Sequence, residues 1–313
     1  KERAIRDQTR ARVSQELKTA FEAAAFSRDL RLLTSEITRR REENLKLVQL
    51  RYESGRENKG SVLLSEAYLA QARYEDLQAE HSTTTAQSLL FKALGIDTTN
   101  GGNSKLDVIG HVPITEPQKE AARLETGLEG KVLTTPEWRQ AEQLAASAQS
   151  SVTIARAQLF PSLDLTAAVA RRDDAFFPAA RETQSVGLTL TIPLFSGFKD
   201  ISTLRSSTAL AEAAKLNQDN TKREILRKLK QTLAAHLESA AKLKADESFE
   251  RAAIVRSDIA RTRYNNGLLS FEDWDVIEND LIARRKAVLN SRQNQVQTGA
   301  AWEQAIGQGV FSE

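Results

Sequence analysis

RYESG at residues 51–55 and RYNNG at residues 263–267 are two versions of one short motif, and their repetition decides the architecture of this chain. The match continues without a gap over 51–95 and 263–307, at a constant offset of 212 residues. One inserted residue would rotate every later side chain of a helix by about 100°, so a long ungapped match is typical of rigid helices. A repeat of this length indicates two copies of one supersecondary unit. We therefore interpret the chain as a tandem duplication.

The composition favours long, solvated helices. Of 313 residues, 27% are charged and only 6% are aromatic, and the net charge is +2. Interleaved charges with few aromatics are typical of extended helices rather than of a thick globular core. A net charge this small gives no reason to expect nucleic acid as a partner. No run of about 18 apolar residues occurs, which excludes a transmembrane helix but not a transmembrane strand.

Two long helices are expected, at residues 1–53 and 198–262. Apolar residues in both recur three and four positions apart, which is the helical period. A helix over 198–262 would be about 100 Å long, and such a helix needs a coiled-coil-like seam to be stable. Both helices end at the repeated Arg-Tyr-x-x-Gly motif, where glycine can adopt a positive φ and reverse the chain.

Each long helix is expected to be followed by a returning helix, at about 61–95 and 271–306. Asn58 and Ser270 occupy the same position of the repeat, and both residue types are favoured N-caps. Gly95 and Gly307 then end the two copies. Each copy therefore contains a long helical hairpin.

The repeats divide the chain into segments. Residues 1–97 form the first repeat, 98–133 a linker or equatorial segment with at most a short helix near 117–128, and 134–307 the second repeat. Residues 308–313 are a C-terminal tail. Within the second repeat, Thr135 is a candidate N-cap and Pro136 the first residue of a helix that runs to about 159.

The second repeat alone also contains two segments that alternate like strands, at 162–171 and 186–195, within a hairpin over 162–195. Each has about the length of a tilted membrane strand, with an apolar face and a small, polar face. The residues expected to face lipid are Leu163, Leu165, Val169, Val186, Leu188, Leu190 and Ile192. The alternative is a soluble hairpin that packs its apolar face on helices. The helices here are polar, which favours the membrane interpretation.

A lone hairpin is not stable in lipid, because its unpaired edge groups would each cost several kcal/mol. Strands from several chains would have to close one barrel. Because the two copies are related by duplication, the first copy is also expected to contain a strand pair. The position of this pair would lie upstream of residue 1. The sequence is therefore expected to lack one helix and one strand pair at its N-terminal side.

The order of these elements resembles that of the TolC-type outer-membrane efflux protein family. The motifs that carry the resemblance are LFPSL at 159–163, IPLFSG at 192–197, the two Arg-Tyr-x-x-Gly turns, and Leu-Gly or Ile-Gly at 94–95 and 306–307. The resemblance covers nearly the whole chain and is weakest over 98–133. It implies a mainly α fold with a β-hairpin, in which long helices form a trimeric α-barrel and the strands join a shared transmembrane β-barrel.

The same resemblance implies a function and partners. Such proteins are the outer-membrane exit ducts of tripartite efflux pumps or type I secretion systems, with a helical portion in the periplasm. The expected partners are two further copies of the chain in a homotrimer, a periplasmic adaptor (membrane fusion) protein, an inner-membrane transporter and outer-membrane lipid. Phe176 and Phe177, between the strands, would lie at the outer interface of the membrane.

The resemblance also implies roles for residues at the helical tips. The family places an aspartate six residues after the turn glycine, as a ring at the channel entrance, and Asp273 matches this position. Asp273 also fits a capping box with Ser270, and the two roles are compatible. The turns of the family contact the adaptor, which implies contact roles for a set of six residues; local packing at a helix end is the alternative for the arginines and tyrosines. The set is Arg51, Tyr52, Gly55, Arg263, Tyr264 and Gly267.

No catalytic, metal or cofactor site is expected. His81, His111 and His236 lie far apart in the sequence, without neighbouring ligands at helical spacing. No nucleophile elbow, phosphate loop or zinc motif occurs. The competing hypothesis is a soluble coiled-coil scaffold that binds partners and carries an internal β-hairpin.

Overall fold

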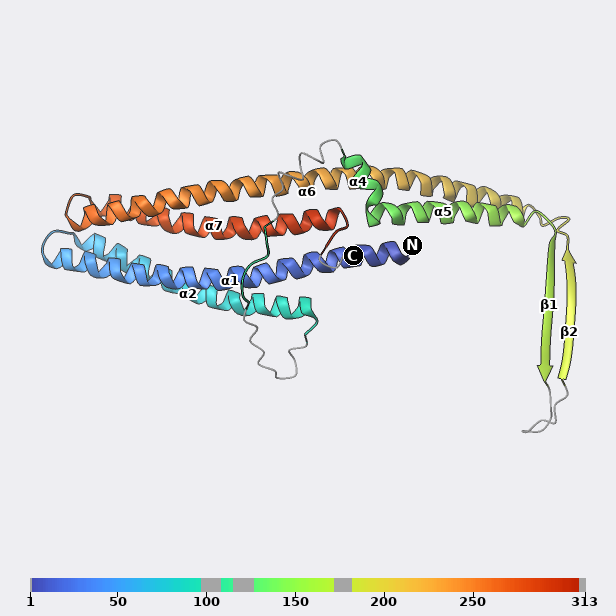
Figure 1. The fold of residues 1–313 in the computed structure, drawn as a ribbon, viewed down its shortest axis with the longest axis horizontal. Helices are drawn as coiled ribbons and strands as arrows, with labels where there is room; N and C mark the ends of the chain where they lie inside the picture. Colours follow the sequence, from blue (N-terminus) through green and yellow to red (C-terminus); the bar gives the residue numbers. More distant parts are fainter. Residues whose placement is uncertain (1, 97–107, 115–126, 172–181, 310–313) are drawn as a thin grey trace. The chain divides into compact units, whose positions relative to one another are not determined.

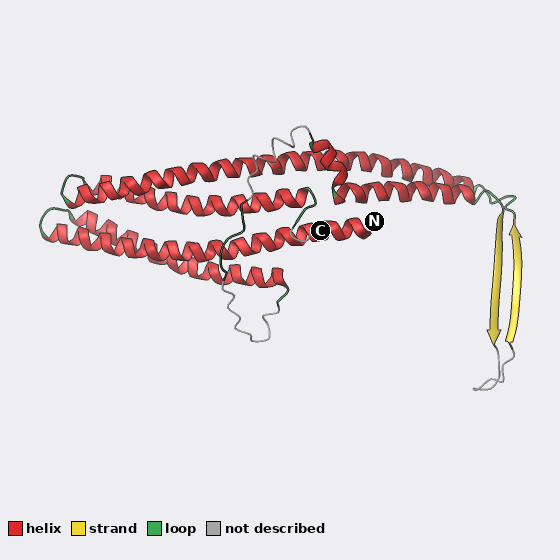
Figure 2. Cartoon of the chain, viewed as in Figure 1, coloured by secondary structure: helices red, strands yellow, loops and turns green. Residues whose placement is uncertain are grey.

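The computed structural model describes residues 2–96, 108–114, 127–171 and 182–309 (Figures 1 and 2). It is mainly helical, with a single two-stranded antiparallel sheet among these residues. In chain order the elements are α1 (Glu2–Glu53), α2 (Lys59–Leu94), α4 (Leu128–Thr134), α5 (Pro136–Ala157), β1 (Ser162–Arg171), β2 (Glu182–Thr191), α6 (Lys199–Asn265) and α7 (Phe271–Ala305). The predicted fold class, mainly α with a β-hairpin and built as a tandem repeat, is confirmed.

The predicted helices lie within a few residues of the observed ones. Asn58 and Ser270 are N-caps, and each accepts a hydrogen bond from a backbone N–H three residues later. Pro136 is the first residue of α5, as predicted, and the Thr135 hydroxyl donates to the carbonyl of Val132 at the end of α4. The α4 helix was not expected. The helix predicted near 117–128 lies almost wholly outside the described residues, as do Phe176 and Phe177.

Four helix ends share one hydrogen-bond pattern, and the repeat sets it. The backbone N–H of Gly55 donates to the carbonyl of Tyr52 at 2.9 Å, and the backbone N–H of Arg56 donates to the carbonyl of Arg51 at 2.8 Å. The pattern recurs at the turn after α6 and at the ends of α2 and α7. This is the Schellman arrangement, which requires a left-handed residue. Gly55 and Gly267 have φ of 70° and 73°, so the two predicted turns are chemically the same turn.

The chain divides into two compact units. One consists of Glu137–Glu224 and holds α5, the hairpin and the first part of α6. The other combines Glu2–Pro136 with Ile225–Glu313, so it holds α1, α2, α4, the second part of α6 and α7. This division does not follow the repeat boundary, because α6 continues from one unit into the other. The division by repeats remains a prediction.

In the larger unit, α1 packs against both α2 and α7 (Figure 1). The contact between α1 and α2 lies within the first copy, and the contact between α1 and α7 joins the copies. Val48 of the first copy is buried in a cluster with Ala260, Tyr264, Phe271 and Trp274 of the second. The two helical hairpins therefore share a core near their turns.

In the smaller unit, β1 and β2 pair antiparallel, but the second strand is not where the sequence placed it. Strand β2 spans Glu182–Thr191 instead of 186–195. Ser162 pairs with Thr191 at the start of the ladder. Pro161 and Pro193 flank this pair, and proline has no N–H to extend a ladder. The pairing extends toward Glu182 instead, and Ile192 lies beyond the strand.

The predicted faces of the hairpin survive this shift. Leu163 lies opposite Leu190, Leu165 opposite Leu188, and Ala167 opposite Val186. Residues directly opposite each other in an antiparallel pair point to the same side. The apolar residues of both strands therefore share one face. No helix in the described part of the chain is apolar enough over a sufficient length to cross a membrane.

Candidate functional site

The first turn of α7 holds Asp273 in an exposed capping arrangement. The Asp273 backbone N–H donates to Ser270 Oγ at 3.1 Å, and the Ser270 hydroxyl donates to the Asp273 carboxylate at 2.9 Å. The side chain of Asp273 is exposed. A carboxylate is also favoured at the N-terminus of a helix, where backbone N–H groups carry partial positive charge. The capping role is thus realised within one chain, and it leaves the carboxylate open to solvent.

Arg51 and Tyr264 connect the two turns. The guanidinium carbon of Arg51 lies 4.3 Å from the centre of the Tyr264 ring, and Arg51 donates to the Tyr264 carbonyl. On its other face, the ring stacks on Trp274 with centroids 4.4 Å apart. The Tyr264 hydroxyl donates to Glu57 at 3.1 Å. Burial raises the pKa of Tyr264, and the Glu57 carboxylate adds to the rise.

The six residues predicted to contact an adaptor therefore differ in exposure. Tyr264 is fully buried and Arg51 half-buried, so in this chain they brace the turns from within. Tyr52, Gly55, Arg263 and Gly267 are exposed. A buried aromatic ring supports a turn, whereas the exposed members are the ones that a second molecule could reach.

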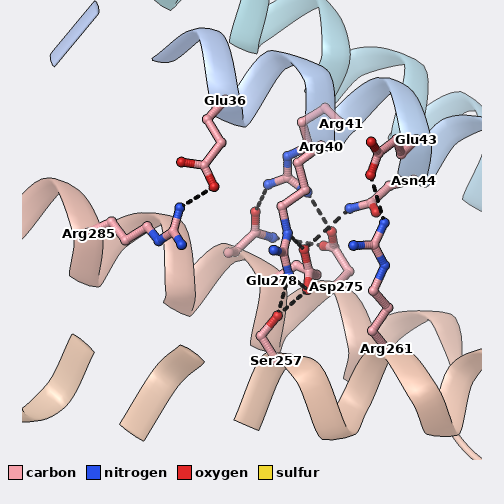
Figure 3. A network of polar contacts seen from close by, with 11 residues as sticks. Glu36, Arg40, Arg41, Glu43, Asn44, Ser257, Arg261, Asp275, Glu278 and Arg285 are labelled. Carbon is pink, nitrogen blue, oxygen red and sulfur yellow. Dashed lines mark hydrogen bonds and ion pairs between the residues drawn. The ribbon is translucent and has the colours of Figure 1, made fainter. Parts of the chain in front are cut away.

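A buried ionic network between α1, α6 and α7 is the feature that the sequence analysis missed (Figure 3). Arg40 binds the Glu278 carboxylate through two nitrogens, each 2.7 Å from an oxygen. Ser257 Oγ accepts from Arg40 and donates to Glu278, both at 2.5 Å. The Glu278 side chain is only 1% exposed. Three helices from both copies thus meet at one carboxylate.

The electrostatics of this network favour the ionised pair. Burial alone would raise the pKa of Glu278, but hydrogen bonds from Arg40 and Ser257 and the Arg40 charge outweigh it, so the pKa is lowered. Next to it, burial raises the pKa of Asp275, although Arg41 lies 3.7 Å away. Arg41 also stacks on Tyr68 of α2, at 4.6 Å from the ring centre.

A sequence signal for this network exists. Glu278 lies four residues after Trp274 and three before Leu281, and all three are buried on one stripe of α7. Arg41 and Asn44 likewise interrupt the buried stripe of α1 between Ile37 and Val48. Charged residues on an apolar stripe are rarely buried without partners. Matching the polar residues of the two stripes would have predicted that α1 and α7 meet here, but not the ion pair itself, because Glu278 binds Arg40 and the base on the stripe is Arg41.

The hairpin presents its apolar face to the surroundings. Every predicted lipid-facing residue is more than half exposed: Leu163 63%, Leu165 72%, Val169 67%, Val186 78%, Leu188 68%, Leu190 61% and Ile192 54%. A contiguous apolar surface of this kind marks an interaction with another molecule or a membrane. The hairpin therefore does not bury its apolar face within its own unit, which favours the membrane interpretation.

The histidine positions do not form a metal site in the part of the chain that the structure describes. His111 lies between two carboxylates of α1, 3.3 Å from Glu22 and 2.9 Å from Asp29. The backbone N–H of Val112 also donates to Glu22. This contact ties the segment 108–114 to α1, which is a structural role.

Comparison with known proteins agrees with this geometry. The alkaline protease secretion protein AprF of Pseudomonas aeruginosa is 25% identical over 262 residues, which cover 81% of this chain and 54% of AprF. The solvent efflux pump outer membrane protein SrpC of Pseudomonas putida is 22% identical over 255 residues, covering 79% of this chain and 51% of SrpC. The chain thus spans about half the length of these relatives.

Solved structures share the fold. The outer membrane protein VceC from Vibrio cholerae matches with a TM-score of 0.78 at 22% identity, over 98% of this chain and 72% of VceC. The model of the family described as "Outer membrane efflux protein" matches residues 133–308, which is more than half of the chain. The chain therefore belongs to the outer membrane efflux protein family, which confirms both the resemblance and the outer-membrane localisation expected from its sequence.

Proposed function

We propose that the protein is a passive exit duct in the outer membrane, serving a tripartite efflux pump or a type I secretion system. The observation that carries the proposal is the hairpin's exposed apolar face in a member of this family. The names of SrpC and AprF refer to solvent efflux and to protease secretion, and both processes need such a duct. No catalytic role is proposed.

The hairpin would enter the membrane as part of a barrel shared by three chains. Its one face carries leucine and valine, and its other face carries threonine, serine and aspartate. A lipid face opposite a wet face is what a barrel strand requires. Closing the barrel between chains would satisfy the hydrogen-bonding groups at both hairpin edges.

The turns at Gly55 and Gly267 would meet a periplasmic adaptor protein, and through it an inner-membrane transporter. Both turns are exposed and chemically alike, so three chains would present a ring of similar docking points. Arg51 and Tyr264 would hold the turns in shape from within, and Tyr52 and Arg263 would contribute to the exposed rim.

A bilayer experiment tests this function. The full-length protein, reconstituted into a planar lipid bilayer, should conduct ions, and its mass in detergent should equal that of three chains. A folded protein that remains monomeric and never conducts would contradict the proposal. The scaffold alternative predicts that outcome.

We propose that Asp273 lines the narrow entrance of this duct as a ring of carboxylates. Like charges around an axis attract cations and repel anions. Asp273→Asn should therefore reduce cation selectivity and weaken block by multivalent cations in single-channel recordings. Asparagine keeps an oxygen acceptor for capping, so folding should change little.

The matched control is Ser270→Ala, which removes the cap but leaves the charge. It should cost about 1 kcal/mol of stability and leave ion selectivity unchanged. If Asp273→Asn left selectivity unchanged in an intact trimer, capping would be the whole role of Asp273.

A further inference from the structure

The contact between the two copies uses one arginine and one tyrosine of the repeated motif. Arg51 of the first copy covers the ring of Tyr264 in the second, with its guanidinium carbon 4.3 Å from the ring centre. Tyr264 is 0% exposed as a result of this cover and of the stack on Trp274. The contact is directional, because the arginine comes from the first copy and the tyrosine from the second.

The other arginine and tyrosine of the motif stay uncovered. Arg263 is the repeat equivalent of Arg51, and Tyr52 is that of Tyr264. Tyr52 is 44% exposed, and Arg263 is exposed too. Among the described residues, neither side chain has a hydrogen-bond or ion-pair partner. The chain thus carries an unused donor on its second copy and an unused acceptor on its first.

The two turns show the same difference in cover. At Gly267, Arg51 Nη2 lies 4.0 Å from the position that a Cβ would take. At Gly55, no side chain lies within 4 Å of the corresponding position. The surface next to Gly55 is therefore open where its counterpart is occupied by an arginine.

We propose that Arg263 of one protomer covers Tyr52 of the next protomer, with a second copy of this chain as the partner. Within one chain, the arginine of the first copy covers the tyrosine of the second copy. When the same contact is repeated between chains, the arginine of the second copy lies beside the first copy of the next chain. A head-to-tail contact of this kind builds a ring when its rotation closes. The inference rests on the proposed trimeric duct and assigns residues to the seam between its chains.

Charges on the two outer faces are complementary in the same register. Glu66 of α2 is exposed and is the equivalent of the buried Glu278. Arg256 of α6 takes the position of Asn44, whose amide lies 3.4 Å from Glu278. Arg256 remains 59% exposed although it binds Asp280. A repeated contact of the same kind would therefore bring Arg256, still largely exposed in its pair with Asp280, to the exposed carboxylate of Glu66 at a second level of the seam.

Site-specific crosslinking tests the proposal, and the chain helps because it contains no cysteine. The single variants Tyr52→Cys and Arg263→Cys are produced together in the outer membrane, treated with a short bis-maleimide and separated by denaturing electrophoresis, so that a crosslink between the two positions must join two chains. A crosslinked dimer is expected. Each single variant produced alone should remain a monomer, because identical positions on neighbouring chains lie apart in a ring.

The matched control is Glu36→Cys with Arg285→Cys. These side chains pair at 2.6 Å across the two copies of one chain and are partly exposed. This variant should react within one chain and keep the mass of a monomer. If the control reacts and the two single variants produced together still yield only monomers, the proposed contact is wrong.

Two measurements separate this failure from failure of the proposed function. A conducting trimer without the crosslink would overturn the seam assignment and leave the duct in place. A protein that is monomeric in detergent and does not conduct would overturn both.

Discussion

Replacing Arg40 by methionine should destabilise the larger unit by about 3–5 kcal/mol, because it leaves a buried carboxylate without its partner. Glu278 is 1% exposed, and each of its two carboxylate oxygens accepts a hydrogen bond from Arg40. Methionine keeps much of the side-chain volume, so the loss reports on the ion pair rather than on a cavity. The measurement is the guanidinium concentration at the midpoint of unfolding of the detergent-solubilised protein. Unfolding is monitored by the circular dichroism signal of the helices.

Arg73→Met is the matched control for this experiment. Arg73 binds Glu42 at 2.9 Å, but the two side chains are 63% and 41% exposed. Exposed pairs contribute only about 0–1 kcal/mol, so this variant should unfold almost like the parent protein. If both variants lost the same free energy of unfolding, the burial of Glu278 would not be the reason why its ion pair with Arg40 stabilises the protein.

The pH dependence gives an independent readout of the same pair. The pKa of Glu278 is lower in the folded protein than in the unfolded chain. Ionised Glu278 therefore adds to the free energy of unfolding at pH values above its pKa in the unfolded chain. This stabilisation is lost as the pH falls through its pKa in the folded protein. In the Arg40→Met variant the carboxylate keeps its burial but loses the cation, so its pKa should rise. The stability difference between parent and variant should therefore narrow on acidification.

The elements with a long, regular signal were predictable from the sequence. The ungapped repeat located both helical hairpins, and Asn58 and Ser270 located the starts of α2 and α7 because capping depends on local chemistry. The faces of the strands followed from alternation alone. For the caps and the strand faces, the information lay within a few residues of the structure that it specified.

The features that the sequence analysis missed depend on distant pairing. The ends of β2 depend on its register with β1, and Pro161 and Pro193 decide that register only once the strands are paired. Glu278 binds an arginine that is 238 positions away. Tyr264 and Tyr52 occupy the same position of the repeat, yet Arg51 covers Tyr264 while Tyr52 stays 44% exposed. Equivalent sequence positions thus differ in what packs on them, and no local pattern shows this difference.

Replacing Leu188 by arginine should cost about 2–4 kcal/mol, because a residue toward the middle of a membrane strand lies far from both interfaces. Leu188 pairs with Leu165 in the fourth of the ten pairs of the hairpin, and it is 68% exposed in the single chain. A guanidinium on this face would have to leave water for hydrocarbon. The measurement is folding into lipid vesicles at increasing guanidinium concentration, which gives the free energy of membrane insertion.

The neighbouring residue provides the control, because successive side chains of a strand point to opposite faces. Thr189 pairs with Asp164 on the polar face of the hairpin. In a water-filled barrel, Thr189→Arg should insert almost as well as the parent protein, and its effect should appear in conductance instead. Equal tolerance of arginine at 188 and 189 would contradict a lipid face, since two faces in water do not distinguish the substitutions. If the hairpin separates lipid from lumen, arginine at 188 should reduce membrane insertion, whereas arginine at 189 should change only the conductance.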